Sequence, residues 1–328
     1  MTRILTVGAA QLGPIQRNDT RADVVDRLLL LLRQGAARGC DLIAFPELAL
    51  TTFFPRWYLE DPAEIDQWYE REMPGVETKV LFDEAKALGV GFTLGYAELH
   101  TDEAGVTHRY NAQTMVERDG AVVGTYRKTH IPGHETYEPH RPFQHLERYY
   151  FESGRQGFPV WRAFNGIVGM ATCNDRRWPE TYRVMGLQGV ELITIGYNTP
   201  IYYAPDPGQN ALQLFHNDLC MASGAYQNGT WVVGVAKGGT EEGVESLCQS
   251  AIFAPSGQVV ARALTTSDEL IVAACDLDLC FNFKHTLFQM DRYREPQHYA
   301  RITSQKGVID PPLEPDFTPA QFKIPRKP

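Results

Sequence analysis

The apolar positions of the chain follow two different periods. An apolar stripe at helical spacing covers residues 24–32, and Thr20 and Asp23 ahead of it form a capping box, which predicts a helix that ends near Gly39. The uninterrupted apolar run 42–45 follows at once and predicts a strand buried on both faces. Helical and strand patterns therefore alternate from the beginning of the chain.

The same order recurs further along, together with two hairpin signals. A helix over 79–88, ended by a glycine, precedes a strand over 90–97. Asp119-Gly120 separates two alternating apolar segments within 110–126, and Ser256-Gly257 separates a second pair. Tight turns join antiparallel strands, whereas helical crossovers join parallel ones. The pattern predicts an α/β protein with mixed sheets faced by helices.

Composition and charge exclude several functional classes. No apolar run is long enough to cross a membrane and the first residues lack a signal-peptide pattern, so we expect a cytoplasmic protein. The net charge of -9 argues against a nucleic-acid partner. Six cysteines at irregular spacing, none in a C-x-x-C pair, are interpreted as free thiols.

The end of the chain differs from the rest. Prolines recur from Gly307 onward and exclude regular helix or central strand, which predicts an extended tail over 307–328 after one large domain over 1–306. Such a tail either stays disordered or packs on the surface of its own or a neighbouring subunit. Its apolar residues, from Leu313 to Ile324, favour packing.

Several familiar catalytic motifs are missing. The sequence contains no G-x-S-x-G, no G-x-x-x-x-G-K-[ST] and no H-E-x-x-H. His130 and His134 are four residues apart, but Pro132 and Gly133 between them prevent a helix that would place both on one face. No metal site and no cofactor are predicted.

Cys173 is the first candidate for a reactive residue. It follows the apolar strand 168–172 and opens the polar turn that leads to Pro179. A thiol just ahead of a helix start gains the positive end of the helix dipole, and Arg176 and Arg177 would favour the thiolate further. A free cysteine is more often a small buried hydrophobic residue, so the position alone decides nothing.

Two charged residues at other strand ends give Cys173 a chemical context. Glu47 closes the strand 42–45, and Lys128 follows the second strand of the first hairpin. Taken singly, Glu47 is more simply explained as part of a salt bridge at a strand end, and Lys128 as a charge in a loop. Together with Cys173 they supply a general base, a group that stabilises an oxyanion and a nucleophile, the parts needed for acyl transfer.

These three segments resemble the signatures of the nitrilase superfamily of carbon-nitrogen hydrolases. The segments 45–57, 141–147 and 173–180 further resemble the N-carbamoyl-D-amino-acid amidohydrolases. The resemblance covers residues 3–302 and leaves the tail uncovered. It implies a four-layer α-β-β-α sandwich, no cofactor, and assembly into a homodimer or homotetramer.

The resemblance also implies roles for individual residues. Glu47 would be the general base, Lys128 the oxyanion stabiliser and Cys173 the nucleophile, while Glu147 would orient Lys128 and assist proton transfer. Arg176 and Arg177 would hold a substrate carboxylate, which suits the forked geometry of guanidinium groups. The remaining substrate contacts implied in this way are His130, His145, Asn174, Asn198 and Thr199.

The expected reaction is the hydrolysis of N-carbamoyl-D-amino acids to D-amino acid, ammonia and carbon dioxide through a carbamoylated Cys173. A β-ureido acid, a carbamoylated amine or a simple amide is an alternative substrate, and a catalytically silent scaffold is an alternative role. The segment 199–210, with Tyr202 and Tyr203, either shapes a pocket for a bulky side chain or packs against a partner subunit.

Overall fold

The computed structural model describes residues 2–312, so the apolar residues predicted to anchor the tail lie outside the described residues. The described residues divide into two units, residues 2–288 and residues 289–312.

Two six-stranded sheets form the centre of the first unit. The first sheet has the order β14-β1-β2-β3-β4-β5 and the second the order β13-β12-β9-β8-β7-β6. The first contains β1 (Ile4–Gln11), β2 (Leu42–Ala44), β3 (Gly91–Thr101), β4 (Thr107–Val116), β5 (Val122–Arg127) and β14 (Glu269–Asp276). The second contains β6 (Val160–Ala163), β7 (Gly166–Thr172), β8 (Leu192–Tyr197), β9 (Trp231–Ala236), β12 (Ala251–Phe253) and β13 (Val259–Arg262).

Both sheets are mixed, as the sequence predicts. The three strands β1, β2 and β3 are parallel to one another, and so are β7, β8 and β9, while the other pairs are antiparallel. The short strands β10 (Thr240–Glu241) and β11 (Val244–Glu245) form a separate hairpin. Each sheet therefore has three parallel strands at its centre, and ligand sites commonly form at the carboxyl ends of such strands.

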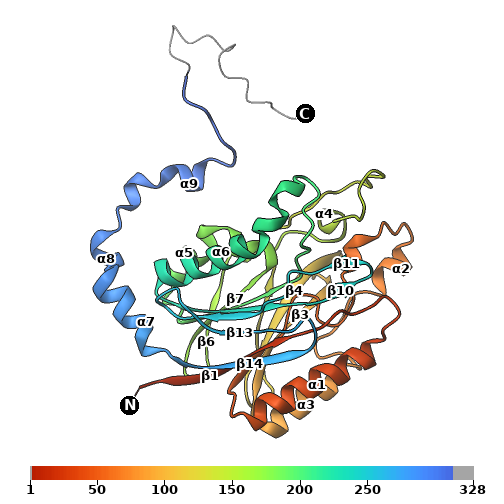
Figure 1. Cartoon of the computed structure of the whole chain (residues 1–328), viewed down its shortest axis with the longest axis horizontal. Helices are drawn as coiled ribbons and strands as arrows, with labels where there is room; N and C mark the ends of the chain where they lie inside the picture. Colours follow the sequence, from red (N-terminus) through yellow and green to blue (C-terminus); the bar gives the residue numbers. More distant parts are fainter. Residues whose placement is uncertain (1, 313–328) are drawn as a thin grey trace. The chain divides into compact units, whose positions relative to one another are not determined.

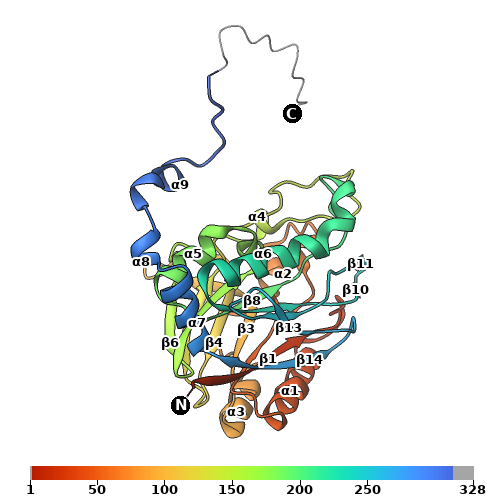
Figure 2. The same cartoon turned by 60° about the vertical axis from the view of Figure 1, so that its left-hand side comes forward.

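Helices cover the outer face of each sheet. The helices α1 (Arg21–Ala37) and α3 (Lys79–Leu88) lie against the first sheet, and α5 (Pro179–Leu187) and α6 (Gln213–Asn228) lie against the second (Figure 1; Figure 2). The buried layer between the sheets is apolar, with Val7, Ala44, Met170 and Val233 fully buried. The predicted four-layer α-β-β-α sandwich is confirmed.

Local signals set the ends of the helices. Thr20 accepts a hydrogen bond from the backbone of Asp23, and the Asp23 carboxylate accepts one from Thr20, which is the predicted capping box of α1. Gly89 adopts the left-handed conformation after α3 (φ 67°). The predicted hairpins are β4–β5 and β12–β13.

The remaining helices are short. They are α2 (Pro62–Asp66), α4 (Glu147–Tyr150) and α7 (Asp278–Asn282) in the first unit, and α8 (Met290–Tyr293) and α9 (Ala300–Ser304) in the second. Among residues 2–312 no helix combines the length and the apolar character that crossing a bilayer requires. All six cysteines are free, as predicted.

Two glycines bring the sheets close together at the end of β2. A Cβ atom on Gly95 of β3 would lie 2.7 Å from Cα of Glu47, and one on Gly196 of β8 would lie 2.5 Å from its backbone nitrogen. No real Cβ contact is that short, so only glycine fits at either position. The backbone of Glu47 is therefore held between the two sheets.

Candidate active site

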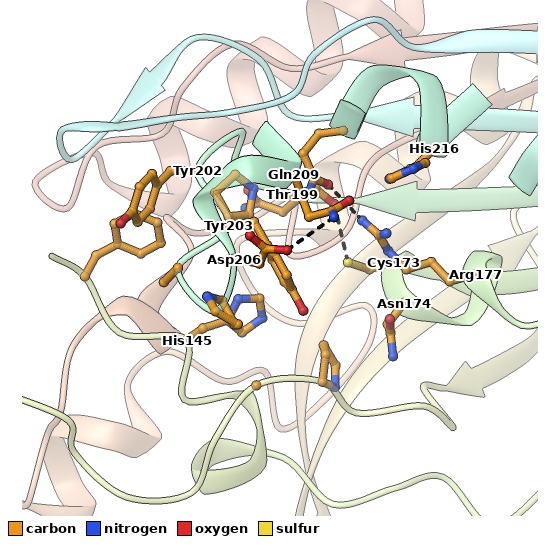
Figure 3. Close-up of a pocket in the computed structure, with 18 of the residues that line it drawn as sticks. His145, Cys173, Asn174, Arg177, Thr199, Tyr202, Tyr203, Asp206, Gln209 and His216 are labelled. Carbon is orange, nitrogen blue, oxygen red and sulfur yellow. Dashed lines mark hydrogen bonds between the residues drawn. The ribbon is translucent and has the colours of Figure 1, made fainter. Parts of the chain in front are cut away.

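A cavity of about 720 Å³ opens where β7 and β8 end. Its lining includes Cys173 and Asn174 on one side and His145 and Tyr202 on the other (Figure 3). The other lining residues are Pro132, Gly133, His134, Arg141, Phe143, Arg176, Arg177, Asn198, Thr199, Pro200, Tyr203, Ala204, Pro205, Asp206, Gln209, Gln213 and His216.

The backbone at Cys173 adopts a conformation that non-glycine residues rarely take. Cys173 follows β7, begins the 3₁₀ turn Cys173–Arg177 and has a positive φ of 47°. Strain of this kind costs about 1–3 kcal/mol and persists only where neighbours enforce it. Asp175 is one of them, because its carboxylate accepts a hydrogen bond of 3.0 Å from the backbone of Thr172. The turn presents the thiol to the cavity, with its Sγ atom 3.9 Å from the Thr199 hydroxyl.

A buried ion cluster lies behind the thiol. The Lys128 ammonium donates to Glu47 Oε1 at 2.8 Å and to Glu147 Oε2 at 2.5 Å, and all three side chains are inaccessible to solvent. Glu47 also accepts hydrogen bonds from the Asn111 side chain and the Asn198 backbone, both at 2.8 Å. Oxygens of both carboxylates and Sγ of Cys173 lie within 4.8 Å of one another.

Burial and neighbouring charges set the protonation of this cluster. Burial lowers the pKa of Lys128, but the negative charges of Cys173, once it is ionised, and of the two carboxylates outweigh it and hold that pKa well above its ordinary value. Burial raises the pKa of Glu147, but Lys128 and His145 outweigh it and the pKa is lowered. An ammonium and an ionised Glu147 are therefore the resting forms.

The thiol behaves differently from the sequence-based expectation. Burial, followed by the negative charge of Glu47, raises the pKa of Cys173, and the opposing effects of Lys128 and Arg176 are smaller. Arg176 acts in the expected direction and lowers the pKa of Cys173, but burial outweighs it, because a desolvated thiol resists ionisation. Cys173 thus needs a nearby base to become a nucleophile.

The two arginines differ in their surroundings. Arg176 is buried, with hydrogen bonds to the Asn217 side chain (2.8 Å), the Cys173 carbonyl (2.6 Å) and the Thr199 hydroxyl (2.9 Å). Arg177 is exposed at the cavity wall, where its one described hydrogen bond goes to Gln213 at 3.2 Å. Desolvation and the neighbouring Arg176 lower the pKa of Arg177. Within residues 2–312 neither arginine pairs with a carboxylate: Asp206, the acidic residue of the cavity lining, accepts hydrogen bonds from Gly208 and Gln209 instead.

The structure brings the predicted substrate contacts to the cavity with one exception. The residues that line it are His145, Asn174, Arg176, Arg177, Asn198 and Thr199. His130 is the exception, because its ring nitrogen and its backbone both bond to Asp175 while its ring stacks on Trp178. His145 also bonds to Glu147, with 2.9 Å between Nε2 and Oε1.

Sequence reasoning missed three supporting residues. Asn111 bonds to Glu47, Asn217 bonds to Arg176, and the buried Asp175 bonds to Tyr126, Thr172 and His130. Asn111 left no clear signal, because strand β4 is polar at most of its positions. Asn217 gave none, because helix α6 is polar at many positions.

The same donor atoms do not suit a metal ion. A thiol and two carboxylates are common metal ligands, but the Lys128 ammonium is hydrogen-bonded to both carboxylates. A cation already satisfies these groups. This arrangement fits proton transfer and charge stabilisation by Lys128 itself.

Comparison with known proteins identifies the family. The family model for carbon-nitrogen hydrolases matches residues 6–285. The chain belongs to this family. The N-carbamoylputrescine amidase of Arabidopsis thaliana is 30% identical over 288 residues, which are 85% of this chain and 89% of the relative. The nitrilase of Pyrococcus abyssi is 27% identical and covers 83% of this chain and 90% of the relative.

A solved structure agrees with this assignment. The carbon-nitrogen hydrolase from Helicobacter pylori G27 superposes with a TM-score of 0.78 at 20% identity, covering 93% of this chain and 99% of that one. The predicted membership of the nitrilase superfamily is therefore confirmed. The protein is a hydrolase that acts on carbon-nitrogen bonds other than peptide bonds.

Proposed function

We propose that this carbon-nitrogen hydrolase converts N-carbamoyl-D-amino acids to D-amino acid, ammonia and carbon dioxide. One observation carries the proposal: two arginines without a carboxylate partner in the described chain, Arg176 and Arg177, line the cavity that contains Cys173. A guanidinium binds a carboxylate through paired N–H groups. The resemblance of segments 45–57, 141–147 and 173–180 to amidohydrolases of this specificity supports the D series.

The electrostatics disfavour the substrate named for the Arabidopsis relative. N-carbamoylputrescine ends in an amine that is cationic at neutral pH, and two arginines in the cavity would repel it. A simple amide or a carbamoylated amine has no anionic group for them to bind. Arg177 is the direct carboxylate contact in this proposal, because the N–H groups of Arg176 bond to Asn217, Cys173 and Thr199.

The first half of the reaction transfers the carbamoyl group to sulfur. Glu47 takes the proton of the Cys173 thiol, and the thiolate attacks the ureido carbon. An ammonium has three N–H donors, and Lys128 uses two of them on Glu47 and Glu147. The third donor, with the backbone N–H of Asn174, stabilises the oxyanion of the tetrahedral intermediate. The C–N bond to the amino acid then breaks, and protonated Glu47 returns its proton to the leaving amine.

The second half hydrolyses the carbamoyl-cysteine. Glu47 takes a proton from water, and the hydroxide attacks the same carbon, again with Lys128 opposite the developing charge. The C–S bond breaks, Cys173 recovers its proton from Glu47, and carbamic acid leaves and decomposes to ammonia and carbon dioxide. Glu147, held by His145 and Lys128, keeps the ammonium in place through both steps. No step requires a metal or an organic cofactor.

The far side of the cavity accommodates the amino-acid side chain in this proposal. Tyr202 packs edge-on against Phe143 with 5.9 Å between ring centroids, and Tyr203 also lines the cavity. Aromatic rings bury large apolar groups well, so the proposal extends to bulky apolar or aromatic side chains. A homodimer or homotetramer and a cytoplasmic location remain predictions from the sequence.

Ammonia release from a substrate panel tests the proposal. The panel contains N-carbamoyl-D- and L-phenylalanine, a β-ureido acid, N-carbamoylputrescine and a simple amide. Turnover of the D-phenylalanine derivative with little release from the others is the expected result. Preferred turnover of N-carbamoylputrescine would overturn the carboxylate assignment. The C173A variant is the control, and it is expected to release no ammonia while keeping the circular dichroism of the native fold.

A further inference from the structure

A second buried ion cluster lies outside the groups assigned to the reaction. It consists of Arg56, Lys237 and Glu241, each with 5% or less of its surface exposed, and is called the Arg56 cluster here. Arg56 donates to Glu241 at 3.0 Å, and Lys237 donates to the same carboxylate at 3.3 Å. Two cations share one carboxylate, so the cluster carries one excess positive charge.

The Arg56 cluster is bonded to the chain segment that leaves Glu47. Lys237 donates to the carbonyl of Thr51 at 2.5 Å, and Glu241 accepts from the backbone of Phe53 at 2.7 Å. Both contacts hold backbone, so they fix the path of residues 51–56 and not merely side chains. Buried charges are costly unless they are paired and hydrogen-bonded. Besides this segment, the cluster holds the backbone of Ile15, whose N–H donates to Glu241 at 3.0 Å.

The same segment also holds the residues that carry Glu147. The carbonyl of Pro55 accepts from the backbone of Leu146 at 2.8 Å. The ring of Phe53 packs edge-on against His145, with 5.5 Å between centroids, and His145 bonds to Glu147. The Arg56 cluster is therefore connected to Glu47 along the chain and to Glu147 through this packing.

The backbone of Lys237 lies close to Glu47 as well. The backbone N–H of Lys237 donates to the carbonyl of Tyr197 at 3.1 Å. Asn198, which follows Tyr197 in the chain, donates its backbone N–H to Glu47. The pKa of Lys237 is lowered, because burial and, less strongly, Arg56 outweigh the negative charges of Glu241 and Glu47. Lys237 and Glu47 therefore attract each other electrostatically.

We infer that Lys237, with Arg56 and Glu241, is a positioning residue for the proposed reaction. The cluster fixes residues 51–56 so that Glu47 and Glu147 meet at Lys128, and the positive charge of Lys237 attracts the Glu47 carboxylate. This role rests on the proposed acid-base function of Glu47. It makes Lys237 a second essential lysine that does not touch the substrate.

The pH dependence of Cys173 alkylation by iodoacetamide tests the inference without any substrate. The charged groups that face the thiol are Glu47, Lys128, Glu147 and Arg176, with His145 and Arg177 further along the cavity. Those that face Lys237 are Glu241, Arg56 and Glu47. Removing a positive charge raises the pKa of every nearby acid, so Lys237→Met is expected to move the midpoint of the alkylation profile up by about 0.5 to 1 pH unit.

Matched variants separate charge from loosening of the fold. Lys237→Arg keeps the positive charge, and its alkylation profile is expected to have the same midpoint as that of the wild type. Arg118→Met removes a cation from a partly exposed ion pair with Asp41, at the opposite end of β2 from Glu47, and is expected to leave the midpoint unchanged. If Lys237→Met does not fold, Arg56→Gln removes the same charge from the cluster and is expected to give the same upward movement.

Two results would overturn the inference. One is a Lys237→Met or Arg56→Gln profile that coincides with the wild-type profile. The other is an equal displacement in Arg118→Met. Because alkylation needs no turnover, a failure of the carbamoyl substrate panel leaves this test standing. With an active substrate, Lys237→Met is further expected to lower kcat at least tenfold with little change in KM, because the cluster does not contact the cavity.

Discussion

Replacing Lys128 with methionine removes the cation that separates two buried carboxylates. Oxygens of Glu47 and Glu147 lie within 4.8 Å of each other, and in the wild type both bond to the same ammonium. At about 5 Å and an effective dielectric constant of about 20, two such negative charges repel by about 3.3 kcal/mol. Deleting one member of a buried ion set costs about 3–5 kcal/mol in total.

The repulsion makes the stability loss depend on pH in a defined direction. In the wild type the pKa of Glu147 is lowered, so its contribution to stability is present above the ordinary carboxyl pKa and lost as pH falls through the lowered value. Without Lys128 the two carboxyls share a proton, and the pKa of the pair is raised. The folded variant then binds a proton that the unfolded chain has released, and its stability falls as pH rises above the ordinary carboxyl pKa.

Urea unfolding followed by tryptophan fluorescence measures this effect. The free-energy deficit of Lys128→Met relative to the wild type is expected to be larger at pH 8 than at pH 5, by up to about 3 kcal/mol. The double variant Lys128→Met, Glu147→Gln keeps a single carboxylate and is expected to regain most of that difference at pH 8. A deficit that is equal at both pH values, or a double variant no more stable than Lys128→Met, would refute the electrostatic reasoning.

Three further substitutions give independent checks. Gly196→Ala places a Cβ 2.5 Å from the backbone nitrogen of Glu47 and is expected to lower kcat by about tenfold or more, whereas Gly307→Ala, with no atom within 4 Å, is a neutral control. Arg177→Met is expected to raise KM for an N-carbamoyl amino acid by about 10- to 100-fold, with partial recovery in Arg177→Lys. Asp175→Asn weakens the bonds to Tyr126 and the backbone before Cys173, and is expected to destabilise the protein by about 1–3 kcal/mol in urea unfolding.

Much of the fold follows from short-range signals in the sequence. The capping box at Thr20 and the glycine after residue 88 act within a few residues, so the ends of α1 and α3 are predictable without knowledge of the rest. The order of strands in each sheet is not predictable in this way. It depends on packing between segments far apart in sequence, such as the approach of Gly196 to Glu47.

The candidate site shows the same division. Cys173, Glu47 and Lys128 are suggested by strand ends and by resemblance, and the structure places them together. The protonation state of Cys173 could not be predicted from the sequence. Its raised pKa comes mainly from burial, which no local sequence pattern indicates. Asn217 was missed for a related reason, since its bond to Arg176 joins a helix to a turn 41 residues away.

Because Glu47 is held between the two sheets, the activity of the enzyme depends on how the sheets pack against each other. Glu47 and Lys128 follow strands of one sheet, whereas Cys173 and Asn198 follow strands of the other. A sliding of one sheet past the other by an ångström would leave each half folded and separate the base from its thiol. Catalytic activity should therefore disappear on heating before the secondary structure does, and mutations deep in the interface between the sheets should silence the enzyme without unfolding it.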